Sequence, residues 1–272
     1  MSGASTHVTV VVPAFNEADR LPRTLNDIAS FVEADGRRFE IIVVDDGSVD
    51  STSAVVARMA RAYPLIRLIR MPRNRGKGHA VRTGVVNAIG ERVLFADADG
   101  ATPIEELYRL ERALDDGADV AIGSRAVASA DVRVEARPLR RLSGRIFHLL
   151  VRYLTVQGIV DTQCGFKLFT GAAAVDLFSR MRMDGFAFDV ELLMMAQRRS
   201  YRIAEIPVNW THQPGSKVSV VRDGLRMARD LFRIRANALR GLYETPHLAP
   251  GFIPSTPTIG RWEPQSVTHA GR

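Results

Sequence analysis

Short apolar runs rich in β-branched residues recur along the first half of the chain, separated by longer segments with helical periodicity. The expected strands span 7–15, 39–48, 65–71, 93–99 and 118–125, and the expected helices span 17–35, 50–64, 76–90 and 103–116. In the first helical segment, apolar residues fall on one stripe at Leu21, Leu25, Ile28 and Val32. Strands that alternate with helices predict an α/β fold, in which a mostly parallel central sheet carries helices on both faces.

Polar and charged residues stand where the expected strands end. They are Asn16 and Glu17, Asp45 and Asp46, Asp97 and Asp99, and Ser124 and Arg125. The carboxyl ends of parallel strands meet at one edge of a sheet, and ligands of such sheets bind there. Because several independent strand ends share this feature, the sequence predicts one binding site at this edge rather than unrelated surface turns.

The stretch VLFADADGAT, residues 93–102, places two carboxylates directly after a buried apolar run. Burying an ionised aspartate without a partner costs several kcal/mol, so we expect Asp97 and Asp99 at the end of the strand. If the extended geometry continues, both side chains point the same way and offer hard oxygen ligands to one divalent cation. On this stretch alone a solvated turn is an equal alternative, because Asp and Gly are common turn residues.

The glycine patterns of two large nucleotide-binding classes are absent from the sequence. Neither G-x-G-x-x-G after the first strand nor the P-loop pattern G-x-x-x-x-G-K-[ST] occurs, which disfavours a dinucleotide dehydrogenase and a P-loop NTPase. The segment RNRGKGHA, residues 73–80, is a different glycine-rich element. Gly76 and Gly78 allow close approach of the backbone to a ligand, and Lys77 supplies positive charge. Placed between two strand ends, it predicts a phosphate-binding loop, although a basic surface loop has the same composition.

The charge balance favours an anionic partner. Lys and Arg number 37 against 30 acidic residues, giving a net charge of +7, which suits nucleic acid, a membrane surface or a phosphorylated substrate. Cys164 is the only cysteine, which excludes an intrachain disulfide and a Cys-rich zinc site. No apolar run approaches the roughly 20 residues of a membrane-spanning helix, and the N-terminus lacks a signal-peptide pattern. We therefore expect a cytosolic chain, free or associated with a membrane.

Several motifs resemble known proteins. Five segments of the first half are similar to the nucleotide-sugar-binding half of family 2 glycosyltransferases. They are VVVPAFNE, IIVVDDGSVDST, NRGKGHAVRTG, FADADGAT and IGSR. Three segments of the second half resemble the dolichyl-phosphate or polyprenyl-phosphate β-glucosyltransferases. They are GIVDTQCGFKLF, FAFDVELL and EIPVNWTHQPGSK.

The resemblance runs from about residue 8 to 240. It implies a GT-A-like fold with a single catalytic domain, 1–243, whose nucleotide-sugar half covers about 7–125 and whose acceptor half covers about 126–243. The Pro-rich tail, 244–272, is expected to be extended or disordered.

The resemblance also implies roles for individual residues on the donor side. The residues expected to line the uridine pocket or face the nucleotide are Pro13, Ala14, Asn16, Glu17, Asp46, Lys77 and Gly78. Asp97 and Asp99 match the family's Asp-x-Asp motif, in which the second carboxylate holds Mg²⁺ or Mn²⁺ and the first lies close by. The metal would neutralise charge on the departing UDP. His212 is a further metal candidate, with a core or surface histidine as the alternative.

The sequence departs from the mannosyl branch of the family. Dolichyl-phosphate mannose synthases commonly read D-A-D-L-Q, whereas this chain has Gly100 and Ala101 after Asp99. This resembles the glucosyl branch. Asp189 and Glu191, in the segment FDVEL, are further candidates near the donor or metal, but acids at a helix start also act as caps.

The resemblance implies inverting transfer of glucose from UDP-glucose to a polyprenyl phosphate, giving a β-glucosyl phosphate lipid. Such an acceptor needs no general base, because its phosphate, with a second pKa of about 6, is already ionised at neutral pH. Cationic side chains would guide it towards the donor. The candidates are Arg125, the arginines of 137–145, Lys167 and Lys217. Asp161 would orient the acceptor or sugar, or brace these cations.

Two basic segments show amphipathic helical spacing, 142–158 and 223–243. In the second, Leu225, Phe232 and Leu239 recur on one stripe among arginines. Basic amphipathic helices bind anionic membrane interfaces, which predicts peripheral attachment to the cytosolic membrane surface. The alternative for each segment is a helix that packs on the sheet with its arginines in water.

Other functions remain open alternatives at this level. The same fold could use another donor such as GDP-mannose, or a soluble acceptor, or bind a sugar nucleotide without turnover. A nucleic-acid-binding protein is suggested by charge alone and leaves the carboxylates at the strand ends unexplained. We therefore expect no nucleic-acid partner. The oligomeric state is open, with a homodimer as one alternative.

Overall fold

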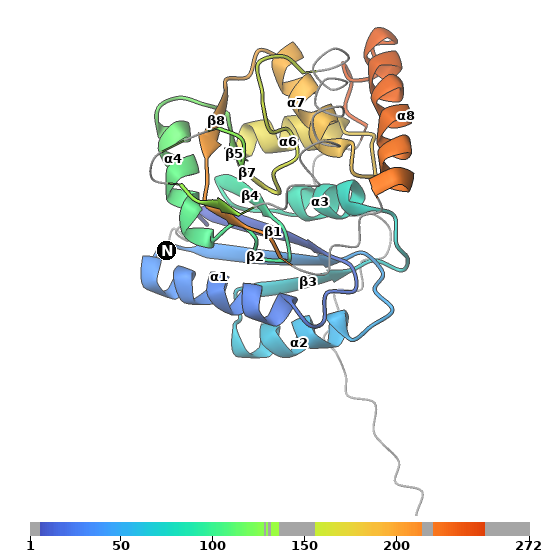
Figure 1. Cartoon of the computed structure of the whole chain (residues 1–272). Helices are drawn as coiled ribbons and strands as arrows, with labels where there is room; N and C mark the ends of the chain where they lie inside the picture. Colours follow the sequence, from blue (N-terminus) through green and yellow to red (C-terminus); the bar gives the residue numbers. More distant parts are fainter. Residues whose placement is uncertain (1–5, 128, 130–131, 136–155, 214–219, 248–272) are drawn as a thin grey trace, which may run out of the picture.

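The chain folds around one central sheet, shown in the computed structural model of Figure 1. The structure describes residues 6–127, 129, 132–135, 156–213 and 220–247. The sheet has seven strands in the order β3-β2-β1-β4-β7-β5-β8. Their bounds are β1 Val8–Ala14, β2 Phe39–Asp45, β3 Ile66–Arg70, β4 Arg92–Ala96, β5 Val120–Ser124, β7 Phe166–Thr170 and β8 Ile203–Pro207. A second, two-stranded sheet pairs β6, Val134–Glu135, with β9, Trp210–Thr211.

The sheet is mostly parallel, as the sequence predicts. β1 pairs in parallel with β2 and with β4, and β5 pairs in parallel with β8. The exception is β7, which is antiparallel to both of its neighbours, β4 and β5. A strand from the second half of the chain therefore lies inside the sheet built by the first half.

Helices cover both faces of the sheet (Figure 1). Their bounds are α1 Leu21–Asp35, α2 Thr52–Ala62, α3 Lys77–Val86, α4 Leu107–Asp115, α6 Gly171–Arg180, α7 Phe188–Arg198 and α8 Val220–Leu239, with a 3₁₀ turn, η1, at Ile104–Glu106. One core joins α1, α2 and α4 to side chains such as Val10 and Leu94, and the other joins α3, α6, α7 and α8 to side chains such as Val11 and Phe95. Neighbouring strand residues point to opposite faces, so β1 and β4 contribute to both cores.

The first helix begins at Leu21 rather than at the start of the predicted segment. Before it, the backbone N–H of Glu17 donates to Thr52 Oγ1 at 2.8 Å, and Arg20 pairs with the Glu17 carboxylate at 2.7 Å. These contacts hold residues 17–20 in a turn against the start of α2. Pro22 follows in the first turn of α1, where a missing N–H costs little.

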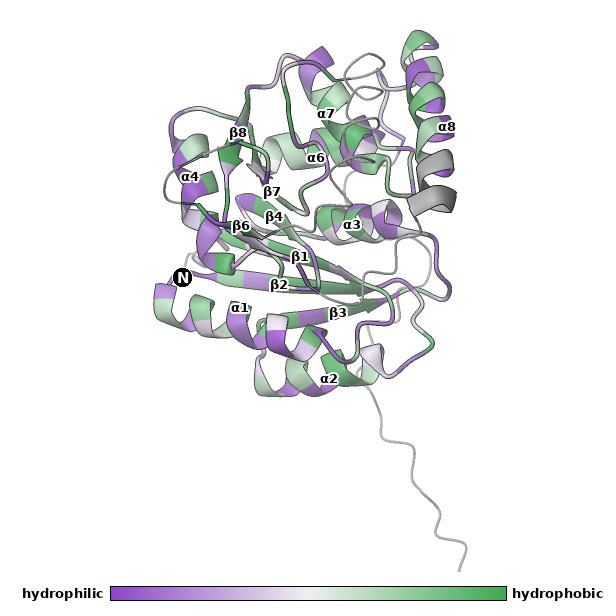
Figure 2. Cartoon of the chain, viewed as in Figure 1, coloured by the Kyte–Doolittle hydropathy of each residue, from purple (hydrophilic) through white to green (hydrophobic). Residues whose placement is uncertain are grey.

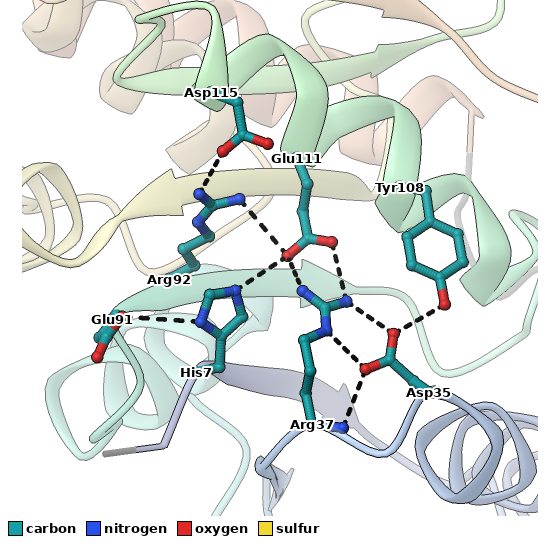
Figure 3. A network of polar contacts seen from close by, with 8 residues as sticks. All are labelled: His7, Asp35, Arg37, Glu91, Arg92, Tyr108, Glu111 and Asp115. Atoms are coloured by element: carbon teal, nitrogen blue, oxygen red, sulfur yellow. Dashed lines mark hydrogen bonds and ion pairs between the residues drawn. The ribbon is translucent and has the colours of Figure 1, made fainter. Parts of the chain in front are cut away.

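A network of charged side chains joins elements at the amino ends of the strands (Figure 3). Its centre is Glu111 on α4, which is 5% exposed and accepts two hydrogen bonds from Arg37, at 2.8 and 3.0 Å. His7 and Arg92, at the starts of β1 and β4, lie 3.7 and 3.6 Å from the same carboxylate. The network ties α4 to the sheet at the edge opposite the predicted binding site.

Helix α8 carries two apolar sets at helical spacing. Leu231 and Ile234 are fully buried in the core shared with α7. Phe232 and Leu239 are 59% and 79% exposed. Phe232 and Leu239, from the stripe that the sequence predicts for this segment, therefore face outward, and Figure 2 shows hydrophobic and hydrophilic positions alternating along the helix. Within the described ranges, no helix combines the length and apolar character needed to cross a membrane. The other amphipathic segment lies outside the described residues except for 156–158.

Gly84 marks the close contact between α3 and the sheet. A Cβ atom at this position would overlap Val11 Cγ1 and lie 3.2 Å from Val44 Cγ2. We expect Gly84→Ala to lower the free energy of unfolding by about 1–3 kcal/mol, because overpacking outweighs the better helix propensity of alanine. Urea unfolding would measure this. A variant more stable than the wild type would contradict the close contact.

Candidate active site

Hydrogen bonds connect the residues at and directly after the carboxyl ends of β1 and β2. The backbone N–H of Asp46 donates to the Ala14 carbonyl at 2.8 Å, and Pro13 and Ala14 are buried at the end of β1. Asn16 adopts a left-handed φ of 54°. Its N–H donates to Ser48 Oγ at 2.8 Å, and its Oδ1 accepts from Val49 N–H at 2.9 Å. The structure thus places these residues at the predicted edge, where Asn16 also shapes the 48–50 loop.

Arg20 is a charged residue of this edge that the sequence patterns did not identify. It lies on the turn before α1 and pairs with Glu17. The Glu17 hydrogen bond raises the pKa of Arg20, and the nearby Asp99 and Asp97 carboxylates raise it further. Arg20 therefore adds positive charge beside the Asp-x-Asp motif. Glu17 is engaged in this ion pair, besides its predicted place near the uridine pocket.

Asp46 holds the glycine-rich loop. Its carboxylate is 2% exposed and accepts from the backbone N–H groups of Arg75, at 3.0 Å, and Gly76, at 2.7 Å. Burial raises the pKa of Asp46 to about 6, although the two N–H donors oppose this rise. Gly76 has a φ of 113°, which strongly favours glycine. The predicted contact of Asp46 with the base stays a prediction, while its hold on the loop is visible in the structure.

Lys77 at the start of α3 reaches the first carboxylate of the Asp-x-Asp motif. Its Nζ lies 2.7 Å from Asp97 Oδ1 and 5.1 Å from the centre of the Phe95 ring. Burial lowers the pKa of this ammonium group, but the surrounding carboxylates, Asp97 first, outweigh burial and leave the pKa raised. Behind Asp97, a Cβ atom on Gly165 would overlap the carboxylate. The motif GFK therefore needs its glycine to make room for Asp97.

Asp99 occupies a turn, so the extended geometry considered for residues 97–99 does not continue past β4. Its Oδ1 accepts from Ala101 N–H at 3.1 Å. Thr24 on α1 ties the turn down by donating to the Ala98 carbonyl at 2.9 Å. Burial raises the pKa of Asp99, and the neighbouring Asp97 carboxylate raises it further. A nearby cation would offset both effects.

The donor set of this turn suits Mg²⁺ or Mn²⁺. Such ions bind through one or two carboxylates together with phosphate oxygens, rather than in a complete protein cage. Among the described residues, no group of three or more His, Cys, Asp or Glu side chains is arranged to hold a metal. Asp99 and Asp97 therefore fit a metal shared with a diphosphate. Thr211 N–H donates to the Ala101 carbonyl at 2.9 Å, which places β9 beside the turn, but His212 itself stays a predicted ligand.

Arg125 and Asp161 form a bidentate ion pair. Arg125 Nε and one terminal nitrogen donate to the two Asp161 oxygens at 2.7 and 2.8 Å, and the Arg125 backbone N–H adds a bond of 3.0 Å. Burial disfavours both charges, but the pairing outweighs it, so the pKa of Arg125 is raised and that of Asp161 lowered. The guanidinium also lies 5.5 Å from the Trp210 ring centre. Asp161 thus fits the bracing role considered for it.

Glu205 on β8 supports this pair, and the sequence patterns did not identify it. Its carboxylate accepts from Ser124 Oγ at 2.7 Å and from the N–H groups of Val160 and Asp161 at 2.9 and 2.7 Å. The end of β5 and the 158–164 loop are therefore held by one side chain. Its partners are distant in the sequence, which explains why no local motif reveals it.

The structure corrects the role expected for Lys167. The side chain is 0% exposed, and its Nζ contacts Asp189 Oδ1 at 2.5 Å and the Cys164 carbonyl at 2.6 Å. An ammonium group in this position cannot meet an incoming phosphate. Asp189 is likewise buried beneath the site as the partner of Lys167. Lys217 and the arginines of 137–145 lie outside the described residues.

Comparison with known proteins identifies the class. The profile of Glycosyl transferase family 2 matches residues 9–176. The chain therefore belongs to glycosyl transferase family 2.

Within this family, the chain is similar in sequence to the branch of the dolichyl-phosphate β-glucosyltransferases. The chain is 43% identical over 249 residues to the Homo sapiens protein named dolichyl-phosphate beta-glucosyltransferase, covering 87% of this chain and 77% of that protein. It is 38% identical to the Saccharomyces cerevisiae protein of the same name, covering 87% and 76%. The resemblance inferred from the motifs is confirmed.

Solved structures confirm the GT-A-like fold. Glucosyl-3-phosphoglycerate synthase from Mycobacterium tuberculosis, in complex with UDP, aligns with a TM-score of 0.61 at 20% identity, covering 89% of this chain and 81% of that one. Mannosyl-3-phosphoglycerate synthase from Rubrobacter xylanophilus aligns with a TM-score of 0.61 at 20% identity, covering 91% and 78%. At this identity the likeness concerns the fold.

The buried Lys167–Asp189 pair yields a stability prediction. We expect Lys167→Met to lower the free energy of unfolding by about 3–5 kcal/mol, because it leaves the Asp189 charge buried without its partner. The double variant Lys167→Met/Asp189→Leu should recover most of the loss. As a control, Arg23→Met removes the exposed pair with Asp27 and should cost less than about 1 kcal/mol. Urea unfolding measures all three, and an unchanged stability for Lys167→Met would refute the assignment.

Proposed function

We propose that the chain transfers glucose from UDP-glucose to a polyprenyl phosphate of the dolichyl type, with inversion, to form a β-glucosyl phosphate lipid. The observation that carries the proposal is the Asp-x-Asp turn, with Lys77 and Arg20 beside it, in a chain 43% identical to a dolichyl-phosphate β-glucosyltransferase. Residues 1–243 would act as a single catalytic domain, since β7 from the acceptor half lies within the central sheet.

On the donor side, a metal ion held by carboxylates and two cationic side chains would together bind the diphosphate. Asp99, with Asp97 beside it, would hold Mg²⁺ or Mn²⁺, which when bound supplies positive charge against the departing UDP. Lys77 and Arg20 add fixed positive charge at the same edge. Asp46 keeps the glycine-rich loop in place through Arg75 and Gly76.

The acceptor side requires a cation rather than a base. An ionised phosphate oxygen attacks the anomeric carbon while the bond from that carbon to the UDP oxygen breaks, and no proton has to be removed. Arg125 would guide the phosphate, with Asp161 and Trp210 fixing its guanidinium plane. Asp161 is unsuited to act as a base, because its pairing with Arg125 holds its pKa low.

We also propose that the outer face of α8 attaches the enzyme peripherally to the cytosolic membrane surface. The exposed Phe232 and Leu239 are accompanied by exposed arginines on the same helix and directly after it. These arginines are Arg226, Arg229, Arg233, Arg235 and Arg240. Apolar side chains among arginines suit an interface of acyl chains and anionic headgroups.

A transfer assay tests the activity. With Mn²⁺ and polyprenyl phosphate, label from UDP-glucose should enter the lipid phase, and label from GDP-mannose should not. Asp99→Asn should lower the rate by about 10²–10³-fold, because a neutral amide would hold the metal more weakly and so reduce the positive charge available to the departing diphosphate. Glu105→Gln, an exposed acid nearby, is the matched control and should keep the wild-type rate. Transfer to soluble phosphorylated acceptors only would contradict the proposed acceptor.

Vesicle binding tests the membrane surface. The double variant Phe232→Ser/Leu239→Ser should bind vesicles of mixed phosphatidylcholine and phosphatidylserine at least about tenfold more weakly, since two large apolar side chains no longer leave water. Val175→Ser, an exposed apolar residue on α6, is the control and should bind as the wild type does. Equal co-sedimentation of the double variant and the wild type would exclude α8 as the contact.

A further inference from the structure

The segment 181–185, here called the clamp segment, presses against the glycine-rich loop. A Cβ atom on Gly76 would lie 2.5 Å from the Asp184 carbonyl oxygen, and one on Gly78 would lie 2.5 Å from the Met183 carbonyl oxygen. The backbone N–H of His79 donates to the Asp184 carbonyl at 3.1 Å. Backbone therefore meets backbone over the first turn of α3, directly beside Lys77.

Charged contacts fasten the clamp segment to the same loop and helix. Arg82 on α3 donates to Asp184 Oδ1 at 2.8 Å and to the Met181 carbonyl at 2.8 Å. Arg75 on the loop contacts Asp184 Oδ2 at 3.3 Å. A shift of the clamp segment would therefore move the loop that presents Lys77.

Glu191 binds the backbone of the clamp segment through its carboxylate. This residue of α7 is 0% exposed, and its carboxylate accepts from the backbone N–H groups of Arg182, at 3.0 and 3.1 Å, and Met183, at 2.8 Å. A carboxylate accepts hydrogen bonds through both of its oxygens, whereas an amide of the same size replaces one of these acceptors with an NH₂ donor. Glu191 is therefore engaged with the protein rather than open to the donor or the metal.

The turn after α8 contacts the same carboxylate. Tyr243, which follows α8, is 4% exposed and donates its hydroxyl hydrogen bond to Glu191 Oε1 at 2.8 Å. The Arg182 guanidinium donates to the Leu242 carbonyl at 2.9 and 3.1 Å. The clamp segment thus lies between the glycine-rich loop on one side and the turn after α8 on the other.

We propose that Glu191 and Tyr243 are positioning residues for donor binding, because they hold the clamp segment that sets the backbone around Lys77. Neither residue touches the donor. The inference rests on the proposed UDP site and adds to it two residues behind that site. It predicts that loss of either contact raises the dissociation constant of UDP, whereas a similar loss of stability elsewhere in the chain does not.

The test measures UDP binding in the presence of Mn²⁺ by titration calorimetry. Glu191→Gln should raise the dissociation constant of UDP about tenfold, since a hydrogen bond to a charged group is worth roughly that factor. Tyr243→Phe, which removes only the hydroxyl, should raise it about threefold, as expected for one contact at greater distance from the loop. In transfer assays both variants should raise the KM for UDP-glucose and keep most of kcat at saturation.

Glu111→Gln is the matched control. Glu111 is also a buried acid that accepts hydrogen bonds, but it lies beside His7, Arg37 and Arg92 in the network at the amino ends of the strands (Figure 3). Its variant should lower the melting temperature and leave the UDP dissociation constant unchanged. If Glu191→Gln does not fold, Tyr243→Phe decides the matter.

The outcomes separate the two proposals. Wild-type affinity for UDP in the Glu191 and Tyr243 variants overturns the positioning role, as does equal weakening in Glu111→Gln, and both leave the proposed function intact. A wild-type protein that binds no UDP overturns the proposed donor site itself. Weakening confined to the Glu191 and Tyr243 variants supports the inference.

Discussion

The site depends on the pairing of charges of opposite sign around one aromatic ring. The ammonium groups of Lys77 and Lys167 lie 5.1 and 5.6 Å from the centre of the Phe95 ring, and each meets a carboxylate, Asp97 and Asp189 respectively. Lys167 and Asp189 are buried, so neither charge would be tolerated there alone, whereas Lys77 and Asp97 are partly exposed. Together they fix the end of β4, the start of α3 and the start of α7, and so the turn that carries Asp99.

Much of the fold follows from hydrophobic periodicity, whereas strand orientation and helix facing do not. The five expected strands and four expected helices of the first half are present, with shifted ends. The antiparallel β7 was not foreseeable, because its direction depends on where the chain re-enters the sheet. For α8, two apolar sets share a helical period, and only packing against α7 decides that Leu231 and Ile234 turn inward while Phe232 turns outward.

The candidate site was predictable where a motif is local. Asp97, Asp99 and Lys77 follow from strand ends and glycines, and the structure brings them together. The phosphate-guiding role predicted for Lys167 is wrong, although its apolar neighbours Phe166 and Leu168 indicate a buried strand. Arg20, Glu205 and Glu191 act through partners on other elements, which no local pattern reports.

The place of β7 restricts how this enzyme can move. Sequence order suggests a donor half followed by an acceptor half, yet β7 of the second half hydrogen-bonds to β4 and β5 of the first. Within the described residues the two halves therefore share one hydrogen-bonded sheet, which opposes a rigid-body rotation of one half against the other. A closing movement over a bound ligand would then be confined to segments outside this sheet, while the strands beneath remain a fixed platform.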